Sequence, residues 1–191
     1  MTKSLPPSHF RRLYEANPDP WGFDTSSYEL DKYRHTVEAL GDRRFAFGLE
    51  VGCSIGVLTR MLAFRCDKLF GVDIVEDPLF AARSRCVDQP HVRFAKIHVP
   101  VEWPAEPFDL IVFSEVLYFL SAADIACCAR RVFDTLLPGG LVVLVNWLGK
   151  TDDPSSADAA PSHFIAATSA TLRIVLQERH EHYRLDILAS A

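Results

Sequence analysis

Short apolar runs alternate with helical patterns from residue 45 onward, and this alternation constrains the fold more than any other feature of the chain. The apolar runs are residues 45–51, 68–73, 92–97, 109–114 and 140–146. Helical patterns fill the gaps at about 55–65, 78–86 and 121–136. Because short buried strands that alternate with helices form parallel sheets, the pattern predicts a doubly wound α/β core.

The last part of the chain departs from this alternation. Two alternating runs, Leu172–Glu178 and Tyr183–Leu188, are joined by a charged turn and predict an antiparallel hairpin. Pro138-Gly139-Gly140 predicts a sharp turn between the preceding helix and the fifth strand. The small, polar residues 151–162 predict a loop, and residues 163–170 a short helix. We therefore expect a seven-stranded, mostly parallel sheet that is closed by an antiparallel C-terminal hairpin.

The N-terminal region has a different character, because two pairs of prolines interrupt it. Ser8 is expected to cap a short helix over Phe10–Asn17, and Ser26 or Ser27 a second helix that ends near Leu40. This region is also rich in aromatic side chains: Trp21, Phe23, Tyr28 and Tyr33. It could form a lid over a ligand, or a helical pair that only packs on the sheet edge.

The length and charge of the chain limit its possible functions. Its 191 residues fit one domain, in which residues 1–40 form the helical lid and residues 41–191 a Rossmann-like core. The net charge is −5 and no basic run occurs, which disfavours nucleic acid as a partner. No apolar stretch reaches membrane-spanning length and no signal-peptide pattern is visible, so we expect a cytoplasmic protein, with a monomer favoured.

A glycine-containing segment, Phe47–Gly56, follows the pattern strand, turn, helix. Gly52 and Gly56 bracket the turn, and glycines at such a turn let the backbone approach a ligand closely. Asp73 ends the next apolar run, twenty-one residues after Gly52. An acid at this offset can accept hydrogen bonds from both hydroxyls of a ribose, so the pair predicts a nucleoside-containing cofactor.

The charge beside the turn narrows the choice of cofactor. Ser54 stands where a dinucleotide fingerprint has its middle glycine, which a pyrophosphate needs for close approach. Glu50, just before the turn, would repel phosphates but suits a cationic or zwitterionic ligand. S-adenosylmethionine (SAM) fits, because it combines a ribose with an amino acid tail and has no phosphate.

Five motifs in this order resemble class I SAM-dependent methyltransferases over about residues 45–190. They are Glu50–Gly56, Asp73, Phe108–Glu115, Pro138–Gly140 and the terminal hairpin. A narrower resemblance spans nearly the whole chain: Asp19–Glu29 with Lys32-Tyr33, and Ser114–Leu120, are similar to the NodS family of rhizobial nodulation N-methyltransferases. This resemblance implies that the chain methylates the free amine of the non-reducing-end glucosamine in a de-N-acetylated chitooligosaccharide, during Nod factor synthesis, and releases S-adenosylhomocysteine (SAH).

The resemblance also implies which residues contact the cofactor: Trp21, Tyr28, Lys32, Glu50, Gly52, Cys53, Gly56, Asp73, Ile74, Ile97, His98, Val99 and Ser114. Trp21 would cover the methionine end and Lys32 would meet its carboxylate. Ile74 and the segment 97–99 would border the adenine, although the family usually has an Asp where His98 stands nearby. Glu50 could instead cap the sheet's edge amides, and Asp73 the following helix.

The acceptor side would consist of Glu115, Tyr118, Asn146 and Trp147. Glu115 could stabilise the charge that grows on the attacking amine, take its proton, or merely cap a helix that begins near Val116. Asn146 could orient the acceptor or simply cap a turn. A metal site is not expected: His180 and His182 would form a surface pair on one face of a strand. Two other functions stay open, namely methylation of another small-molecule acceptor and a non-catalytic nucleotide-binding module.

Overall fold

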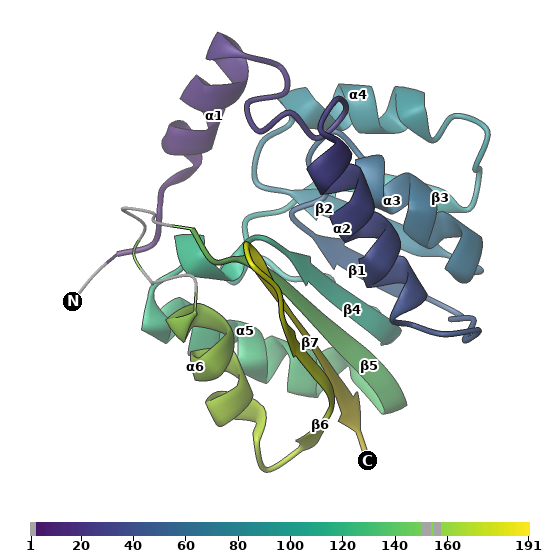
Figure 1. The fold of residues 1–191 in the computed structure, drawn as a ribbon, viewed down its shortest axis with the longest axis vertical. Coiled ribbons are helices and arrows are strands. Elements are labelled where there is room, and N and C mark those ends of the chain that lie inside the picture. The colour runs from purple at the N-terminus through teal and green to yellow at the C-terminus, as the bar shows by residue number, and fades with distance from the viewer. Residues whose placement is uncertain (1–2, 150–153, 155–157) are drawn as a thin grey trace. The chain divides into compact units, whose positions relative to one another are not determined.

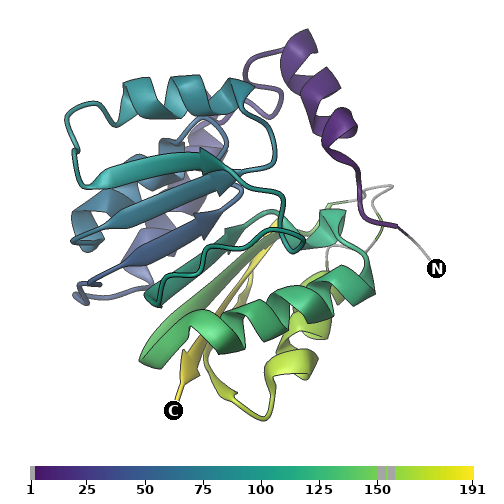
Figure 2. The same ribbon diagram turned by 180° about the vertical axis from the view of Figure 1, so that it is seen from behind.

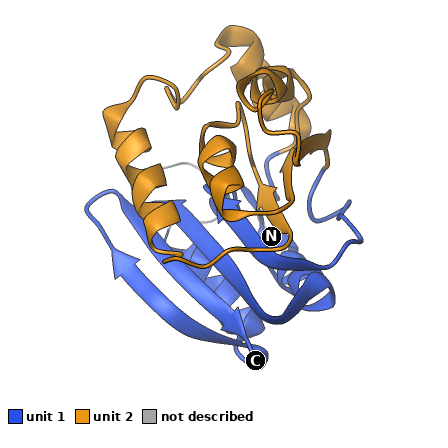
Figure 3. Ribbon diagram, turned by 90° about the vertical axis from the view of Figure 1, so that its right-hand side faces the viewer, with its two compact units in different colours: residues 1–5, 98–191 blue, residues 6–97 orange. Residues whose placement is uncertain are grey.

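The computed structural model describes residues 3–149, 154 and 158–191. It divides into two compact units, which are described separately (Figure 3). Unit 1 contains residues 1–5 and 98–191, and unit 2 contains residues 6–97. The predicted boundary between lid and core at residue 40 therefore falls inside unit 2, and the single-domain organisation stays a prediction.

Unit 2 is built on three parallel strands in the order β3-β2-β1. The strands are β1 (Gly48–Val51), β2 (Leu69–Asp73) and β3 (Val92–Lys96). They are connected through α3 (Val57–Leu62), which continues as the 3₁₀ turn η1 (Ala63–Arg65), and α4 (Asp77–Arg85). Every residue of β1 and β2 is buried, as expected for strands that are covered on both faces.

Two further helices, α1 (Pro7–Ala16) and α2 (Ser27–Glu38), precede these strands. The α2 helix packs on α3, and the two are visible side by side in Figure 1. Ser26 caps α2 by accepting a hydrogen bond from the backbone N–H of Glu29, which confirms one of the two predicted caps. The predicted Ser8 cap is wrong. The α1 helix already begins at Pro7, whose fixed φ suits the first helical position, and no side chain caps it.

Unit 1 contains four strands in the order β4-β5-β7-β6. They are β4 (Phe108–Ser114), β5 (Leu136–Trp147), β6 (Leu172–Arg179) and β7 (Tyr183–Ser190). The β4–β5 pair is parallel, whereas β7 pairs antiparallel with both β5 and β6, so the C-terminal hairpin is confirmed. Its helical segments are η2 (Leu117–Phe119), α5 (Ala122–Thr135) and α6 (Ala159–Thr168), with α6 packed on both others (Figure 2).

The segment before α1 is held in unit 1. The Ser4 hydroxyl donates a hydrogen bond to the carboxylate of Asp124, and its oxygen accepts one from the Ser121 N–H at 2.8 Å. The Leu5 N–H donates to the carbonyl of Phe119 at 2.9 Å. Ser4 and Leu5 are therefore attached to η2 and α5 of unit 1, and unit 2 begins with the next residue.

Two predicted elements have different boundaries in the structure. Pro138–Gly140 is not a turn before a strand but a bulge within β5, because the pairing with β4 jumps from Phe108–Leu136 to Leu110–Leu141. The α6 helix begins at Ala159 rather than near residue 163. The end of the predicted loop 151–162 is thus helical, while residues 151–153 and 155–157 lie outside the described residues.

Within each unit, the strand directions confirm the expected α/β class, with three parallel strands in unit 2 and a parallel pair followed by an antiparallel hairpin in unit 1. All five cysteines are free, and all but Cys127 are buried. In the described part of the chain, the helices are too short or too polar to cross a bilayer.

Candidate functional site

The glycine-containing turn joins β1 to α3 in unit 2. Gly52, Ser54 and Gly56 have φ angles of 82°, 47° and 79°, all in the left-handed region. The N–H groups of Gly52 and Cys53 both donate to the carbonyl of Val72, at 2.8 and 3.1 Å, which folds the turn over the end of β2. The predicted strand, turn and helix are therefore present, and the turn lies beside the predicted ribose-binding acid.

Gly56 also has a packing role that the sequence did not reveal. A Cβ atom at this position would lie 2.9 Å from the Cα and the Cβ of Ala82 in α4. The glycine is thus needed both for its backbone conformation and for the close approach of α4.

Asp73 is the last residue of β2 and only 8% exposed. Its carboxylate accepts hydrogen bonds from the backbone N–H groups of Ser54, at 3.1 Å, and Val75, at 3.0 Å. Burial raises the pKa of Asp73 to about 6, although these backbone donors partly offset the rise. Asp73 does not cap the following helix, which was its alternative role, because α4 begins after Glu76 without a side-chain cap.

Glu50 lies in β1, before the turn, and is 1% exposed. Burial raises the pKa of Glu50 to about 7, the Thr59 hydroxyl offsets part of this rise, and the Asp73 carboxylate adds to it. Within the described residues, Glu50 Oε2 has no hydrogen-bond partner. Two buried acids, one with an unsatisfied oxygen, fit a ligand that carries positive charge and hydroxyl donors, as SAM does.

An aromatic cluster from the N-terminal region lies against this turn. The hydroxyl oxygen of Tyr14, from α1, is 2.6 Å from the Ser54 hydroxyl oxygen. The ring of Trp21 packs edge-on against Tyr14 at 5.6 Å and is stacked with Phe23 at 5.5 Å. Sequence reasoning singled out Trp21 but missed Tyr14. The sequence indicated Tyr14 only weakly, through its spacing of four residues from Phe10, with which it forms the buried face of α1.

Lys32, which was predicted to meet a cofactor carboxylate, is paired with a residue of its own helix in this structure. Its ammonium group is fully buried and lies 2.7 Å from the Glu29 carboxylate. It also lies 5.4 Å from the ring of Tyr28 and 5.5 Å from that of Tyr33. The alternative role, packing of the N-terminal helices, is the one seen for Lys32 in this structure, and Tyr28 takes part in it.

The residues predicted around the adenine are divided between the units. In unit 2, the Ile97 N–H donates to the Asp73 carbonyl at 2.8 Å, and Ile74 directly follows Asp73. Cys53 is buried, with a pKa raised mainly by that burial, so its thiol is not ionised. Unit 1 contains His98, whose N–H donates to the Glu102 carboxylate at 2.8 Å, and the buried Val99.

In unit 1, Glu115 follows Ser114, the last residue of β4. Its φ of 57° lies in the left-handed region, which is uncommon for a residue other than glycine and typical of functional sites. Its N–H donates to the Val145 carbonyl at 2.9 Å, and the Tyr118 hydroxyl donates to its carboxylate across 3.4 Å. Glu115 does not cap a helix, because η2 begins without a side-chain cap.

Asn146 lies near the end of β5 and is fully buried. Neither its amide nitrogen nor its amide oxygen has a hydrogen-bond partner among the described residues. It therefore does not cap a turn. A buried amide is costly unless it is hydrogen-bonded, so both polar atoms of Asn146 are suited to bind a ligand.

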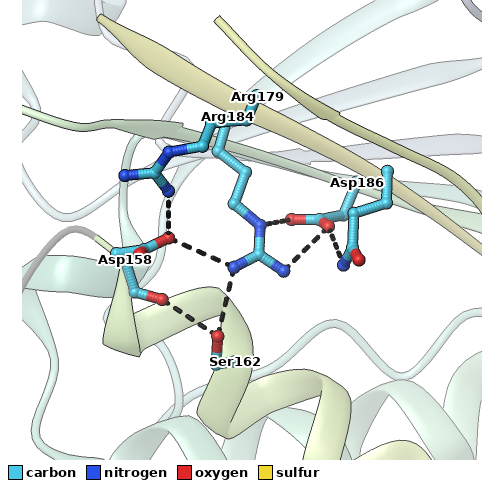
Figure 4. Close-up of polar contacts among 6 residues, drawn as sticks. Asp158, Ser162, Arg179, Arg184 and Asp186 are labelled. Carbon is cyan, nitrogen blue, oxygen red and sulfur yellow. Dashed lines mark hydrogen bonds and ion pairs between the residues drawn. The ribbon is translucent and has the colours of Figure 1, made fainter.

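The register places Asn146 opposite Arg184 of β7. The Arg184 guanidinium contacts the Asp186 carboxylate at 2.8 Å, the Asp158 carboxylate at 3.3 Å and the Ser162 hydroxyl at 3.1 Å (Figure 4). These ion pairs join the start of α6 to the hairpin on the Asn146 side of the sheet.

Trp147, the last residue of β5, pairs with Tyr183. Its ring is stacked with His182 at 5.5 Å, and His180 is stacked with Tyr183 at 4.4 Å. His180 and His182 both lie at the surface, as predicted, but the predicted placement on one strand face is wrong, because both lie in the turn between β6 and β7. The turn thus brings rings to the end of β5 that the sequence did not connect with Trp147.

The structure therefore groups the predicted residues into two sets. Unit 2 brings together the glycine turn, Glu50, Asp73, Ile74 and Ile97, with Trp21 one ring away through Tyr14. Unit 1 brings together Ser114, Glu115 and Tyr118 at the end of β4, and Asn146 and Trp147 at the end of β5.

Comparisons with known proteins identify the family of the chain. Residues 9–144 match the family model described as "Nodulation protein S (NodS)". Nodulation protein S of Bradyrhizobium diazoefficiens is 34% identical over 125 residues, which is 64% of this chain and 60% of that protein. Its counterpart in Sinorhizobium fredii is 31% identical over 130 residues, 67% of this chain and 60% of that protein. The chain thus spans about 60% of the length of these relatives.

A solved structure shows the same fold over almost the whole chain. The N-methyltransferase NodS from Bradyrhizobium japonicum WM9, in complex with SAH, superposes with a TM-score of 0.80 and 24% identity. The superposition covers 96% of this chain and 97% of that one. The predicted class I methyltransferase fold is thereby confirmed.

Proposed function

Because the chain belongs to the nodulation protein S (NodS) family, we propose that it is a SAM-dependent N-methyltransferase. The observation that carries this proposal is the pair of buried acids at the glycine turn, Glu50 and Asp73. Their raised pKa values make them unfavourable as anions in the ligand-free protein, and a cationic nucleoside would favour both.

In this proposal, most of the residues that bind the cofactor belong to unit 2. Asp73 accepts hydrogen bonds from the ribose hydroxyls, and Glu50 favours the amino group of the methionine part. Gly52 and Cys53 offer backbone atoms, and Gly56 keeps the turn narrow. Ile74 and Ile97 border the adenine, together with His98 and Val99, while Trp21 covers the methionine end. We do not assign a cofactor contact to Lys32, because its ammonium is already paired within α2.

When bound, SAM supplies a methyl carbon that is activated by a positively charged sulfur. A neutral amine that takes this methyl group would gain positive charge on its nitrogen, while the bond between the methyl carbon and sulfur breaks and SAH leaves as a neutral thioether. Glu115 is suited to stabilise this charge or to take the proton that the product amine loses, while Tyr118 orients the Glu115 carboxylate. Asn146 offers a buried donor and acceptor for the acceptor's polar groups.

Orientation should supply more of the acceleration than proton transfer. Holding reactants in line can contribute about 7–11 kcal/mol. A general base contributes roughly 10²–10⁴-fold, and an amine that is partly neutral near pH 7 needs little help.

We further propose that the acceptor is the free amine of the terminal glucosamine in a de-N-acetylated chitooligosaccharide. The support is the NodS membership and the rings at the end of β5, since aromatic faces such as Trp147 pack well against sugar faces. Incubation with labelled SAM and matched acetylated and deacetylated chitooligosaccharides tests this. Label in only the deacetylated sugar supports the proposal. Label in neither rejects this acceptor, and calorimetric titration with SAM then shows whether the cofactor part of the proposal survives.

A further inference from the structure

Tyr14 makes a contact for which simple helix packing gives no reason. Its side chain lies on the buried face of α1 and is 6% exposed, like that of Phe10 one turn earlier at 8%. Phe10 shows that a ring alone suffices to fill such a position. Tyr14 differs in that its hydroxyl oxygen approaches the Ser54 hydroxyl oxygen to 2.6 Å, in a buried setting.

The partner of this hydroxyl is a strained residue. Ser54 has a φ of 47°, a conformation that glycine adopts readily and serine seldom does. The same conformation aims the Ser54 N–H at the Asp73 carboxylate, 3.1 Å away. Residues in strained conformations persist only where surrounding contacts hold them, and the Tyr14 hydroxyl is such a contact.

The electrostatics of the contact suit a permanent hydrogen bond. Burial, together with the nearby Asp73 carboxylate, raises the pKa of Tyr14, so its hydroxyl stays protonated over the physiological range. The hydroxyl of Tyr14 thus contacts the hydroxyl of Ser54, and the Ser54 N–H contacts the Asp73 carboxylate. In the proposed function, this carboxylate binds the ribose.

We infer that Tyr14 is a positioning residue for the cofactor, which holds Ser54 in its left-handed conformation and thereby orients the Asp73 carboxylate. The inference rests on the proposed function, because it assumes that Asp73 binds the cofactor. It assigns α1 a part in the affinity for SAM and SAH, although no residue of α1 was predicted to contact them.

The test compares Tyr14→Phe, Ser54→Ala and the double variant, with SAH affinity measured by calorimetry. Tyr14→Phe keeps the ring and removes only the hydroxyl. We expect each single variant to bind SAH about three- to tenfold more weakly, the usual effect of one lost hydrogen bond. The double variant should be no weaker than the weaker single one, because both remove the same contact.

Two control variants and one kinetic measurement distinguish a positioning role of Tyr14 from a packing role. Phe10→Leu loosens α1 without touching Ser54, so it should lower the melting temperature and leave SAH affinity within about twofold. Ser54→Gly removes the strain, so Tyr14→Phe should cost little in that background. The KM for SAM should rise in Tyr14→Phe while kcat stays near the wild-type value.

The outcomes are distinguishable. If the wild type binds SAH and Tyr14→Phe binds equally well, or if the two single effects add, the inference is wrong and the proposed function stands. If the wild type binds neither SAM nor SAH, the proposed function fails, and this inference fails with it.

Discussion

At the residue scale, the candidate site places groups where folding alone would not favour them. Glu50 and Asp73 are both buried acids with raised pKa values, and Ser54 and Glu115 have left-handed backbones. Such features lower the stability of the ligand-free protein and are typical of positions that are kept for binding or catalysis.

The two acids predict opposite pH dependences for stability and for binding. Their folded pKa values, about 7 for Glu50 and about 6 for Asp73, exceed the ordinary values of 4.5 and 3.8. The folded state therefore binds more protons between about pH 4 and pH 7, so the free energy of unfolding decreases as the pH rises through this window. SAM affinity should increase over the same window, because the cation prefers both carboxylates ionised. Thermal melts and SAM titrations at several pH values check both trends.

The variant Glu50→Gln isolates one of the two acids. We expect it to raise the melting temperature of the ligand-free protein near pH 7.5, because a neutral amide replaces a buried anion. It should weaken SAM binding at the same pH by about tenfold or more, the usual effect of losing a hydrogen bond to a charged group. A variant that is less stable and binds SAM as tightly as the wild type would contradict the role given to Glu50.

Glu115 offers a separate test on the acceptor side. Glu115→Gln should reduce kcat by roughly 10²–10⁴-fold if the carboxylate takes the proton, and by less if it only stabilises charge. SAH affinity should stay near that of the wild type, which calorimetry checks. Full activity of the variant would show that Glu115 has neither role.

The sequence predicted the contacts between candidate residues where a local motif carries them, and it missed contacts that depend on packing between distant segments. The glycine turn and Asp73 lie close in sequence, and their spacing alone predicted that they meet. Tyr14 and Ser54 are separated by 40 residues, so only the folded chain reveals their contact. The burial of Lys32 against Glu29 was likewise not predicted, because it depends on how α2 packs.

At the scale of elements, two features of the chain fix how helices pack. Gly56 allows α3 and α4 to approach closely, and Arg184 joins α6 to the hairpin. Each makes a prediction about stability that a matched variant can isolate.

For Gly56→Ala, we expect two costs. A left-handed conformation costs about 1–2 kcal/mol for an alanine. The overlap of the new methyl group with Ala82 should add roughly 1–3 kcal/mol. Gly41→Ala is the matched control, since Gly41 has a φ of 62° but no atom within 4 Å of an added Cβ, so only the first cost applies. Denaturant unfolding of both variants measures the difference. Equal losses would mean that the contact with α4 is unimportant.

For Arg184→Met, we expect a loss of about 3–5 kcal/mol in the free energy of unfolding, because the fully buried Asp186 carboxylate loses its counterion. Arg179→Met is the matched control. Arg179 also contacts Asp158, at 2.7 Å, but its side chain is 60% exposed, so its loss should cost no more than about 1 kcal/mol. Similar losses in both variants would contradict the special role of the buried pair.

The elements themselves were largely predictable, because each strand is a short apolar run and each helix has a recognisable period. The errors have identifiable causes. Pro138–Gly140 has the composition of a turn, yet pairing on both sides of it makes it a bulge inside β5. His180 and His182 fit an alternating pattern, but the tight connection between β6 and β7 needs those residues.

At the scale of the whole molecule, most candidate residues for the cofactor lie in unit 2, whereas the candidate residues for the acceptor lie in unit 1. The glycine turn, Glu50 and Asp73 belong to unit 2, whereas Glu115, Tyr118 and Asn146 belong to unit 1. The alternation of strands and helices predicted the fold of each unit but not this division, because it depends on which segments pack together.

The division predicts where ligands slow amide exchange. SAH should protect residues 50–56 and 73–75 most strongly, since their backbone or side chains face it in the proposed function. Adding a deacetylated chitooligosaccharide should then extend protection to residues 114–118 and 146–149. Mass spectrometry of exchange with no ligand, with SAH and with both distinguishes the two steps. Protection of residues 146–149 by SAH alone, with none at 73–75, would contradict the assignment.

The attachment of Ser4 and Leu5 to η2 and α5 has a practical consequence for dividing the gene. The two units are not consecutive pieces of chain, because unit 1 recruits the first few residues. A gene split between Ile97 and His98 would leave the segment that Asp124 and Phe119 bind on the wrong fragment. Complementation between the two fragments should therefore require the segment with Ser4 and Leu5 on the first fragment. A circularly permuted gene that begins at residue 98 and ends with residues 1–97 would keep this attachment within a single polypeptide.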